Sequence, residues 1–206
     1  MSPFPHIAIL HEDREFVVID KPPVLDSQAS RPDRPSVAQW LEDRCGFAGL
    51  VHRLDFNTTG AMILAKSSGA AARATKALQQ GLIQRSYYGI ALGRIPADEG
   101  VINRPIEGKE CETHFHVLER FANATALELK LGTGRKHQIR RHLSEEGHPL
   151  LGELLYKRKG SDRLHDRPAL HSWRLRWDQL KIEAPLPEDL QRLAQRLRKS
   201  QADFVS

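Results

Sequence analysis

Residues 52–65 read HRLDFNTTGAMILA, a polar turn that leads directly into an unbroken apolar run. The run Gly60–Ala65 has the length and composition of a buried strand, and the residues ahead of it favour a tight turn. Asp55 therefore lies two residues after Arg53 on a rigid support, which a nucleophile or a general base needs. The alternative, an ordinary turn aspartate or helix N-cap, stays open at this point.

The composition is that of a globular protein. The chain has 206 residues, of which 40% are hydrophobic and 28% are charged, so we expect one domain spanning residues 1–206 that can form a core without disulfide or metal staples. Cys45 and Cys111 match no redox or zinc spacing and are interpreted as buried thiols. No apolar run approaches the ~20 residues of a membrane helix, and the N-terminus lacks a secretory pattern, so we expect a cytoplasmic protein with no membrane partner.

Hydrophobic periodicity predicts an α+β fold with a mixed, mostly antiparallel sheet flanked by helices. Apolar alternation and turn signals indicate the following strands: His6–His11, Glu15–Asp20, Gly60–Ala65, Ile83–Leu92, Thr113–Arg120 and Thr125–Leu131. Capping and helical spacing indicate the following helices: Ser36–Cys45, Ser68–Gln80, Arg135–Glu146 and a last helix after Pro187.

The charge distribution favours a polyanionic partner. The chain has 31 Lys and Arg against 26 Asp and Glu, a net charge of +5. Residues 132–143 carry four basic side chains and no acid, and residues 157–176 carry a second cluster: Lys157, Arg158, Lys159, Arg163, Arg167, Arg174 and Arg176. A basic run is ordinarily a solvated face, yet two clusters flanking a candidate active site favour a phosphate backbone.

The segment GTGRKHQIRRHL, residues 132–143, predicts an amphipathic helix. At ~100° per residue, four side chains lie on one side of its apolar stripe: Lys136, His137, Arg140 and Arg141. Arg140 falls at the border of the core, where pairing with a carboxylate would lower the pKa of that carboxyl and keep it ionised. The alternative is a structural helix with solvated arginines.

Tyr87, in an expected strand, is either a core residue or, beside a nucleotide, a stacking or proton-handling group. The sequence predicts no metal site: His137 and His142 are five residues apart, and His114 and His116 lack an indicated carboxylate or cysteine partner. It also contains no phosphate loop and no dinucleotide fingerprint, so no nucleotide cofactor is expected.

Several motifs, in order along nearly the whole chain, resemble those of the RluA-type pseudouridine synthases. They are HRLD with NTTG (52–60), DKPP (20–23), RSY (85–87), GRKHQIR (134–140), GHPLLGE (147–153) and LH (170–171). The sequence departs from the family pattern at Thr59, where serine is more usual, and at Arg85, where lysine is usual. It also lacks the histidine often seen after the DKPP motif, and its stretch Trp177–Ile182 looks shortened.

The resemblance implies a catalytic domain that needs neither cofactor nor metal, with no accessory RNA-binding domain ahead of it. Its partner is RNA, either tRNA or rRNA, and we expect a monomer. By this resemblance, Asp55 is expected to attack the ribose carbon or remove a neighbouring ribose proton, after which the uracil would leave, rotate and rejoin through carbon. The other implied catalytic residues are Tyr87, which contacts the uracil, and Arg140, which pairs with Asp55. The implied RNA-binding residues are Arg53, Arg135, Lys136, His137 and Arg141.

Two other classes of function compete with this interpretation. A non-catalytic RNA-binding module explains the basic clusters but gives no reason for an aspartate beside Arg53. A nucleosidase-type hydrolase needs a second carboxylate at ~5 to 10 Å from the first, and no acidic residue lies in a motif-like setting. Formation of pseudouridine or release of free uracil separates these alternatives.

Overall fold

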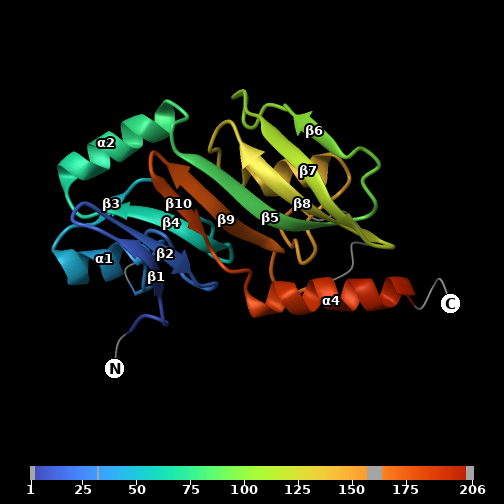
Figure 1. The fold of residues 1–206 in the computed structure, drawn as a ribbon, viewed down its shortest axis with the longest axis horizontal. Coiled ribbons are helices and arrows are strands. Elements are labelled where there is room, and N and C mark those ends of the chain that lie inside the picture. Colours follow the sequence, from blue (N-terminus) through green and yellow to red (C-terminus); the bar gives the residue numbers. More distant parts are fainter. Residues whose placement is uncertain (1–2, 32, 157–163, 203–206) are drawn as a thin grey trace. The chain divides into compact units, whose positions relative to one another are not determined.

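The structure is a computed structural model that describes residues 3–31, 33–156 and 164–202. It contains ten strands and four helices within those ranges (Figure 1). The strands are β1 Ala8–Glu12, β2 Phe16–Lys21, β3 Gly49–Leu50, β4 Thr59–Ala65, β5 Gln84–Leu92, β6 Glu99–Ile102, β7 Thr113–Arg120, β8 Ala124–Leu131, β9 Leu170–Trp177 and β10 Leu180–Glu183. The helices are α1 Val37–Cys45, α2 Ser68–Gln79, α3 Gln138–Glu145 and α4 Glu188–Ala202.

The chain forms two compact units, each built from two stretches of sequence. The first unit comprises residues 1–85 and 172–185, and the second comprises residues 86–171 and 186–206. The chain passes from one unit to the other three times: within β5, within β9, and between β10 and α4. Each unit combines strands with helices, and every pairing with a described register is antiparallel, so the predicted α+β class is confirmed.

In the first unit the strands run in the order β1-β2-β4-β9, with β3 paired to β4 and β10 paired to β9. Strands β2 and β4 are buried along nearly their whole length, because both of their faces are covered. On one face, Phe16, Val18 and Ile63 pack against the alanine-rich side of α2, where small side chains let the helix approach closely. In Figure 1 the helices α1 and α2 lie below and above these strands.

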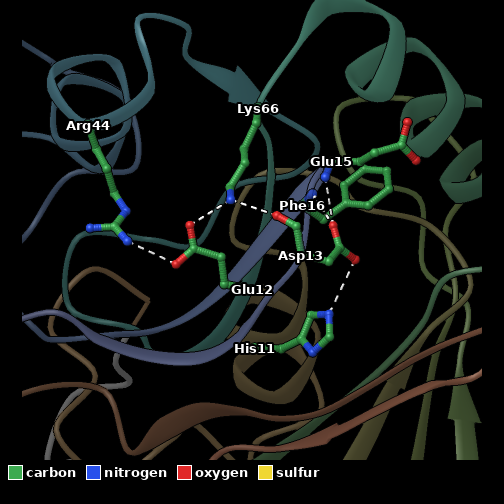
Figure 2. A network of polar contacts seen from close by, with 7 residues as sticks. All are labelled: His11, Glu12, Asp13, Glu15, Phe16, Arg44 and Lys66. Carbon is green, nitrogen blue, oxygen red and sulfur yellow. Dashed lines mark hydrogen bonds and ion pairs between the residues drawn. The ribbon is translucent and has the colours of Figure 1, made fainter.

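A network of polar contacts links the β1–β2 turn to α1 and to the end of β4 (Figure 2). The Asp13 carboxylate accepts hydrogen bonds from the backbone N–H groups of Glu15 and Phe16, both at 2.7 Å, which closes the turn. Glu12 pairs with Lys66 at 2.6 Å and with Arg44 at 2.9 Å, and these cations hold the pKa of the Glu12 carboxyl below its usual range. The network therefore joins the turn to the ends of β4 and α1.

In the second unit the strands run in the order β5-β8-β7-β6. Strand β7 alternates exposed and more buried side chains, as expected for a strand with one solvated face, and it pairs with β8 from Thr113 to Arg120. Helix α3 buries Ile139 and Leu143. Among the described residues, no helix is long and apolar enough to cross a membrane.

Most predicted elements occur within one or two residues of their expected bounds; α1, predicted as Ser36–Cys45, has Ser36 as its N-cap and ends at Cys45. The start of α3 was predicted wrongly, since the helix begins at Gln138 and not at Arg135. The apparent shortening near Trp177 is a tight hairpin: Leu180 pairs with Trp177 across a two-residue turn, and Asp178 adopts a φ of 52°.

Gly60 permits the close approach of β4 and β9 behind residues 53–58, the turn that carries the candidate nucleophile Asp55 and is called the nucleophile turn below. It has a φ of +109°, and a Cβ atom there would lie 2.2 Å from the backbone oxygen of Ser172. We therefore expect Gly60→Ala to lower the free energy of unfolding by more than about 2 kcal/mol, because it adds backbone strain and a clash with main-chain atoms. Urea unfolding measures this change.

Gly69→Ala provides the matched control. Gly69 lies in α2 at a position where an added methyl group would have no atom nearer than 3.9 Å, so alanine should leave stability unchanged or raise it by up to about 1 kcal/mol. Equal effects of the two substitutions would show that the approach of Gly60 to Ser172 is not a constraint.

Candidate active site

The nucleophile turn lies in the first unit, immediately ahead of β4. The Thr58 N–H donates to the Asp55 backbone oxygen at 3.0 Å, which closes the turn that the sequence predicted. Leu54 is buried, Asp55 is half-buried and Arg53 is exposed. The turn is therefore anchored through the apolar residue between its two charged ones.

Ser27 fixes the residue that precedes Asp55. Its hydroxyl donates to the Leu54 backbone oxygen at 2.7 Å and accepts from the Leu54 N–H at 2.9 Å, so one buried side chain satisfies both backbone groups of Leu54. A neighbouring strand would ordinarily make such a pair of bonds. Here a single serine replaces it and restricts rotation of the backbone on the N-terminal side of Asp55.

Lys21 fixes the residue that follows Asp55. Its side chain is fully buried at the end of β2, and its ammonium donates to the backbone oxygens of Pro22 at 2.9 Å, Leu25 at 2.8 Å and Phe56 at 3.2 Å. The Phe56 oxygen also accepts from the Leu25 N–H at 3.3 Å. A buried ammonium is tolerated only when such bonds replace its hydration, so Lys21 holds these carbonyls together.

His52 ties the start of the nucleophile turn to β4. Its Nε2 accepts a hydrogen bond from the Ile63 N–H at 3.2 Å, which requires an unprotonated Nε2. Burial, reinforced by the positive charge of Arg85, lowers the pKa of the His52 imidazole to about 3. His52 is therefore a neutral structural acceptor at neutral pH and not a general acid or base.

Tyr87 lies in β5 within the second unit. Its side chain is buried, and it pairs in register with Leu129 of β8. The adjacent Tyr88 points to the opposite face of the strand, where burial raises the pKa of its hydroxyl to about 12. The structure thus presents two neighbouring tyrosines with different surroundings, and only Tyr87 matches a family motif.

Arg140 projects from α3 into the second unit and is 7% exposed. It makes two hydrogen bonds to Glu153, from Nε at 2.7 Å and from Nη2 at 2.8 Å. Burial alone would raise the pKa of the Glu153 carboxyl, but the Arg140 pair and two backbone N–H groups hold that pKa below its usual range. The expected border position of Arg140 is observed, with Glu153 as a carboxylate partner that the sequence did not indicate.

Tyr156 contacts three of the predicted site residues. His137 Nδ1 lies 2.7 Å from the Tyr156 hydroxyl, and the guanidinium carbons of Arg140 and Arg141 lie 5.5 and 6.0 Å from the centre of its ring. Arg141 also pairs with the exposed Glu107 at 3.0 Å. These cation–π contacts place the basic side chains of α3 around one aromatic ring.

Arg135 and Lys136 are exposed on the turn that leads into α3. This turn replaces the predicted first helical turn, because His137 adopts the left-handed conformation with a φ of 54°. The Gln138 side chain braces it: the amide oxygen accepts from the Arg135 N–H at 3.0 Å, and the amide nitrogen donates to the Glu112 backbone oxygen at 2.8 Å. A buried glutamine thus fixes the backbone that presents both cations.

The second basic cluster is not one solvated face. Arg167 is buried and makes a bidentate pair with Asp189 at the start of α4, and Arg174 pairs with Glu183 and lies over the Trp173 ring. These two arginines stabilise the fold locally. The remaining members before Arg167 lie outside the described residues: Lys157, Arg158, Lys159 and Arg163.

The structure brings His137, Arg140 and Arg141 together around Tyr156 in the second unit, and it places Arg53 and Asp55 on one turn in the first. The predicted meeting of Asp55 with Arg140 stays a prediction. Sequence reasoning missed the supporting contacts of Ser27, Glu153 and Tyr156. Glu153 lies in the GHPLLGE motif, but nothing in the sequence indicated that its partner is an arginine thirteen residues earlier.

Comparison with known proteins identifies the family to which the chain belongs. Residues 15–145 match the family model described as RNA pseudouridylate synthase. A protein of Vibrio parahaemolyticus named ribosomal large subunit pseudouridine synthase D is 35% identical, covering 95% of this chain and 72% of that protein. A Bacillus subtilis protein named as an uncharacterized RNA pseudouridine synthase is 35% identical, covering 90% of this chain and 74% of that protein.

Solved structures agree with this assignment. The human RNA pseudouridylate synthase domain containing 4 has the same fold, with a TM-score of 0.77 and 23% identity over 93% of each chain. The human domain containing 1 protein gives a TM-score of 0.73 and 25% identity over 96% of this chain and 98% of that one. The chain therefore belongs to the RNA pseudouridylate synthase family, and within it to the RluA type. It is an isomerase that forms pseudouridine in RNA.

The buried His52 predicts a specific pH dependence of stability. Its pKa is about 3 in the folded protein, against 6.5 as the reference for an exposed histidine, so between these values only the unfolded chain binds the proton. Stability should therefore fall as the pH decreases from 6.5 towards 3, by up to about 1.4 kcal/mol per pH unit from this residue. Urea unfolding at pH 7, 6 and 5 measures the slope.

His52→Gln removes the titration and keeps an acceptor for the Ile63 N–H, so its stability should depend less on pH than that of the unmodified protein over this range. His116→Gln removes an exposed histidine of β7 and serves as the matched control. Parallel pH profiles for the unmodified protein and His52→Gln would contradict a neutral buried His52.

Proposed function

We propose that this protein isomerises uridines in structured RNA in the cytoplasm, with Asp55 as the nucleophile. The observation that carries the proposal is the double fixation of Asp55: Ser27 holds the backbone of Leu54, and Lys21 holds that of Phe56. A turn aspartate without a chemical task needs no such support. A reacting carboxylate needs it, because small displacements from the productive geometry lower the rate steeply.

In the proposed reaction the bond between the uracil nitrogen and the ribose carbon breaks, and a bond from the same ribose carbon to a uracil carbon forms. Asp55 either attacks the ribose carbon or removes a neighbouring ribose proton. The proton that the newly bonded uracil carbon carries leaves last, with Tyr87 assisting its removal, and the uracil nitrogen that left the ribose takes up a proton; any ribose proton that Asp55 removed returns to the ribose, so substrate and product have the same atoms. No net oxidation or reduction occurs, so the residues bind, orient and transfer protons.

The other predicted residues have supporting roles in this proposal. Arg140 pairs with Asp55 and keeps it ionised, while Glu153 fixes the plane of the guanidinium. Arg53, beside the nucleophile, occupies the space that the flipped base vacates or contacts phosphate. The RNA backbone is bound by the side chains at and before α3: Arg135, Lys136, His137 and Arg141.

We infer that the substrate is large-subunit ribosomal RNA. The support is the name shared by the relatives from Vibrio and from Nitrosomonas europaea, the latter 35% identical over 97% of this chain. A transfer RNA substrate is the competing outcome. Pseudouridine mapping of total RNA from cells with and without the protein decides between them, since the sites that disappear identify the RNA.

Asp55→Asn tests the nucleophile. The amide keeps the volume of the side chain but cannot attack carbon or accept the proton, so pseudouridine formation should fall to background while RNA binding persists. Measurement of pseudouridine in a large-subunit rRNA transcript reports the activity. Asp43→Asn, on the exposed face of α1, is the matched control and should retain full turnover.

The same assay separates the competing classes. A pure RNA-binding module forms no pseudouridine with or without Asp55, and a nucleosidase releases free uracil from the transcript. Either result with the unmodified protein would refute the proposed chemistry, and full turnover by Asp55→Asn would remove Asp55 from its role.

Tyr87→Phe tests the late proton transfer. The substitution keeps the ring and removes the hydroxyl, so product formation in a single turnover should slow by roughly 10²-fold or more, as for loss of a general base. Tyr88→Phe, one position along β5 and on its other face, is the matched control. Equal rates for the two variants would make Tyr87 a packing residue.

A further inference from the structure

The loop Asp26–Ser36, described except for residue 32, lies between β2 and α1 in the sequence. Backbone contacts hold its two ends together. Asp26 and Ser36 form a bridge, and the N–H groups of Val37 and Ala38 donate to the backbone oxygens of Asp26 and Ser27 at 2.8 and 3.0 Å. The Ser27 residue that closes the loop is the same one whose hydroxyl fixes Leu54. The loop is therefore built onto the nucleophile turn and not independent of it.

Arg34 extends from this loop over the nucleophile turn. Its guanidinium carbon lies 5.3 Å from the centre of the Phe56 ring, and Phe56 directly follows Asp55. The Arg34 N–H donates to the Arg31 backbone oxygen at 3.1 Å, which fixes the backbone of Arg34. The guanidinium thus has a defined place although the residue is exposed.

The support beneath Arg34 is rigid. Phe56 is half-buried, and its backbone oxygen accepts from both Lys21 and Leu25. An aromatic face covers one side of the guanidinium and leaves its in-plane N–H donors directed outwards. A long exposed arginine would otherwise be mobile, so Phe56 reduces the entropy that Arg34 loses when it binds a ligand.

The guanidinium of Arg34 is available to an anion. Among the residues that the structure describes, neither Arg34 nor the exposed Arg53 forms an ion pair, whereas the Asp26 carboxylate accepts from the Ser30 hydroxyl at 2.6 Å. Asp33 is the exposed acid of the loop. Planar guanidinium groups bind phosphate oxygens in a bidentate manner. Phosphates are also the commonest hydrogen-bond partners of proteins on nucleic acids, so an arginine without an acidic partner beside an RNA site is expected to bind phosphate.

We propose that Arg34, seated on Phe56, binds a backbone phosphate of the RNA that flanks the target uridine. This inference deepens the proposed function and rests on it. The loop Asp26–Ser36 then has two tasks, since Ser27 positions the nucleophile and Arg34 holds the strand that carries the nucleotide to be flipped.

The test compares Arg34→Ala with Arg14→Ala. Arg14 is an exposed arginine of the same unit, in the β1–β2 turn, and that turn lies at the opposite end of β2 from Lys21. Both variants lose one positive charge. With a large-subunit rRNA transcript, Arg34→Ala should weaken binding about three- to tenfold and reduce the slope of log affinity against log salt by roughly 0.7 to 1. Arg14→Ala should change neither.

A double-mutant cycle tests the role of the ring. Phe56→Leu keeps an apolar side chain but removes the aromatic face, so it should weaken binding less than Arg34→Ala does. The double variant should then bind no more weakly than Arg34→Ala alone. Thermal unfolding of every variant verifies that the turn is intact.

The outcomes are distinct. Equal binding and equal salt slopes for Arg34→Ala and Arg14→Ala would overturn the proposal, as would losses that simply multiply in the double variant. A weaker affinity with an unchanged salt slope would also overturn it, because a base and not a phosphate would be the ligand. Pseudouridine formation by the unmodified protein, and its loss in Asp55→Asn, establishes the proposed function separately from any of these results.

Discussion

The buried ammonium of Lys21 is the interaction on which the site depends. It lies at the end of β2 and collects three backbone oxygens, two from the residues that follow it and one from Phe56, thirty-five positions along the chain. Taking an ammonium out of water is costly, so this arrangement persists only while all the oxygens stay in place. The nucleophile turn, the start of the Asp26–Ser36 loop and β2 are therefore stabilised together.

In the second unit, too, a buried cation is held by fixed oxygen atoms; here the cation is Arg140 of α3. Glu153 holds Arg140 through two bonds, and the turn that carries Glu153 also delivers Tyr156 to His137 and Arg141. Gln138 braces the turn that presents Arg135 and Lys136. In both units, buried polar side chains that take no part in the proposed chemistry hold the groups proposed to contact RNA. These contacts keep the reacting groups ordered before the substrate binds.

Local sequence accounts for much of this arrangement. The predicted bounds of α1, Ser36–Cys45, were correct because capping acts over three or four residues, and the apolar run after Thr59 has the length and composition of the buried strand that is observed. The start of α3 was placed too early because Arg135, Lys136 and His137 have adequate helix propensity. Their backbone is instead set by Gln138 and Glu112, a contact between residues twenty-six positions apart.

The sequence by itself determined the α+β class, the family and the identity of the candidate nucleophile, because short-range patterns and ordered motifs carry that information. Tertiary structure decided which side chains support the site: Ser27 on Leu54, Lys21 on Phe56, Glu153 on Arg140 and Arg34 on the Phe56 ring. Hydrogen bonds and ring contacts between distant positions depend on distances of a few ångströms in the folded chain. No periodicity or spacing along the sequence encodes those distances.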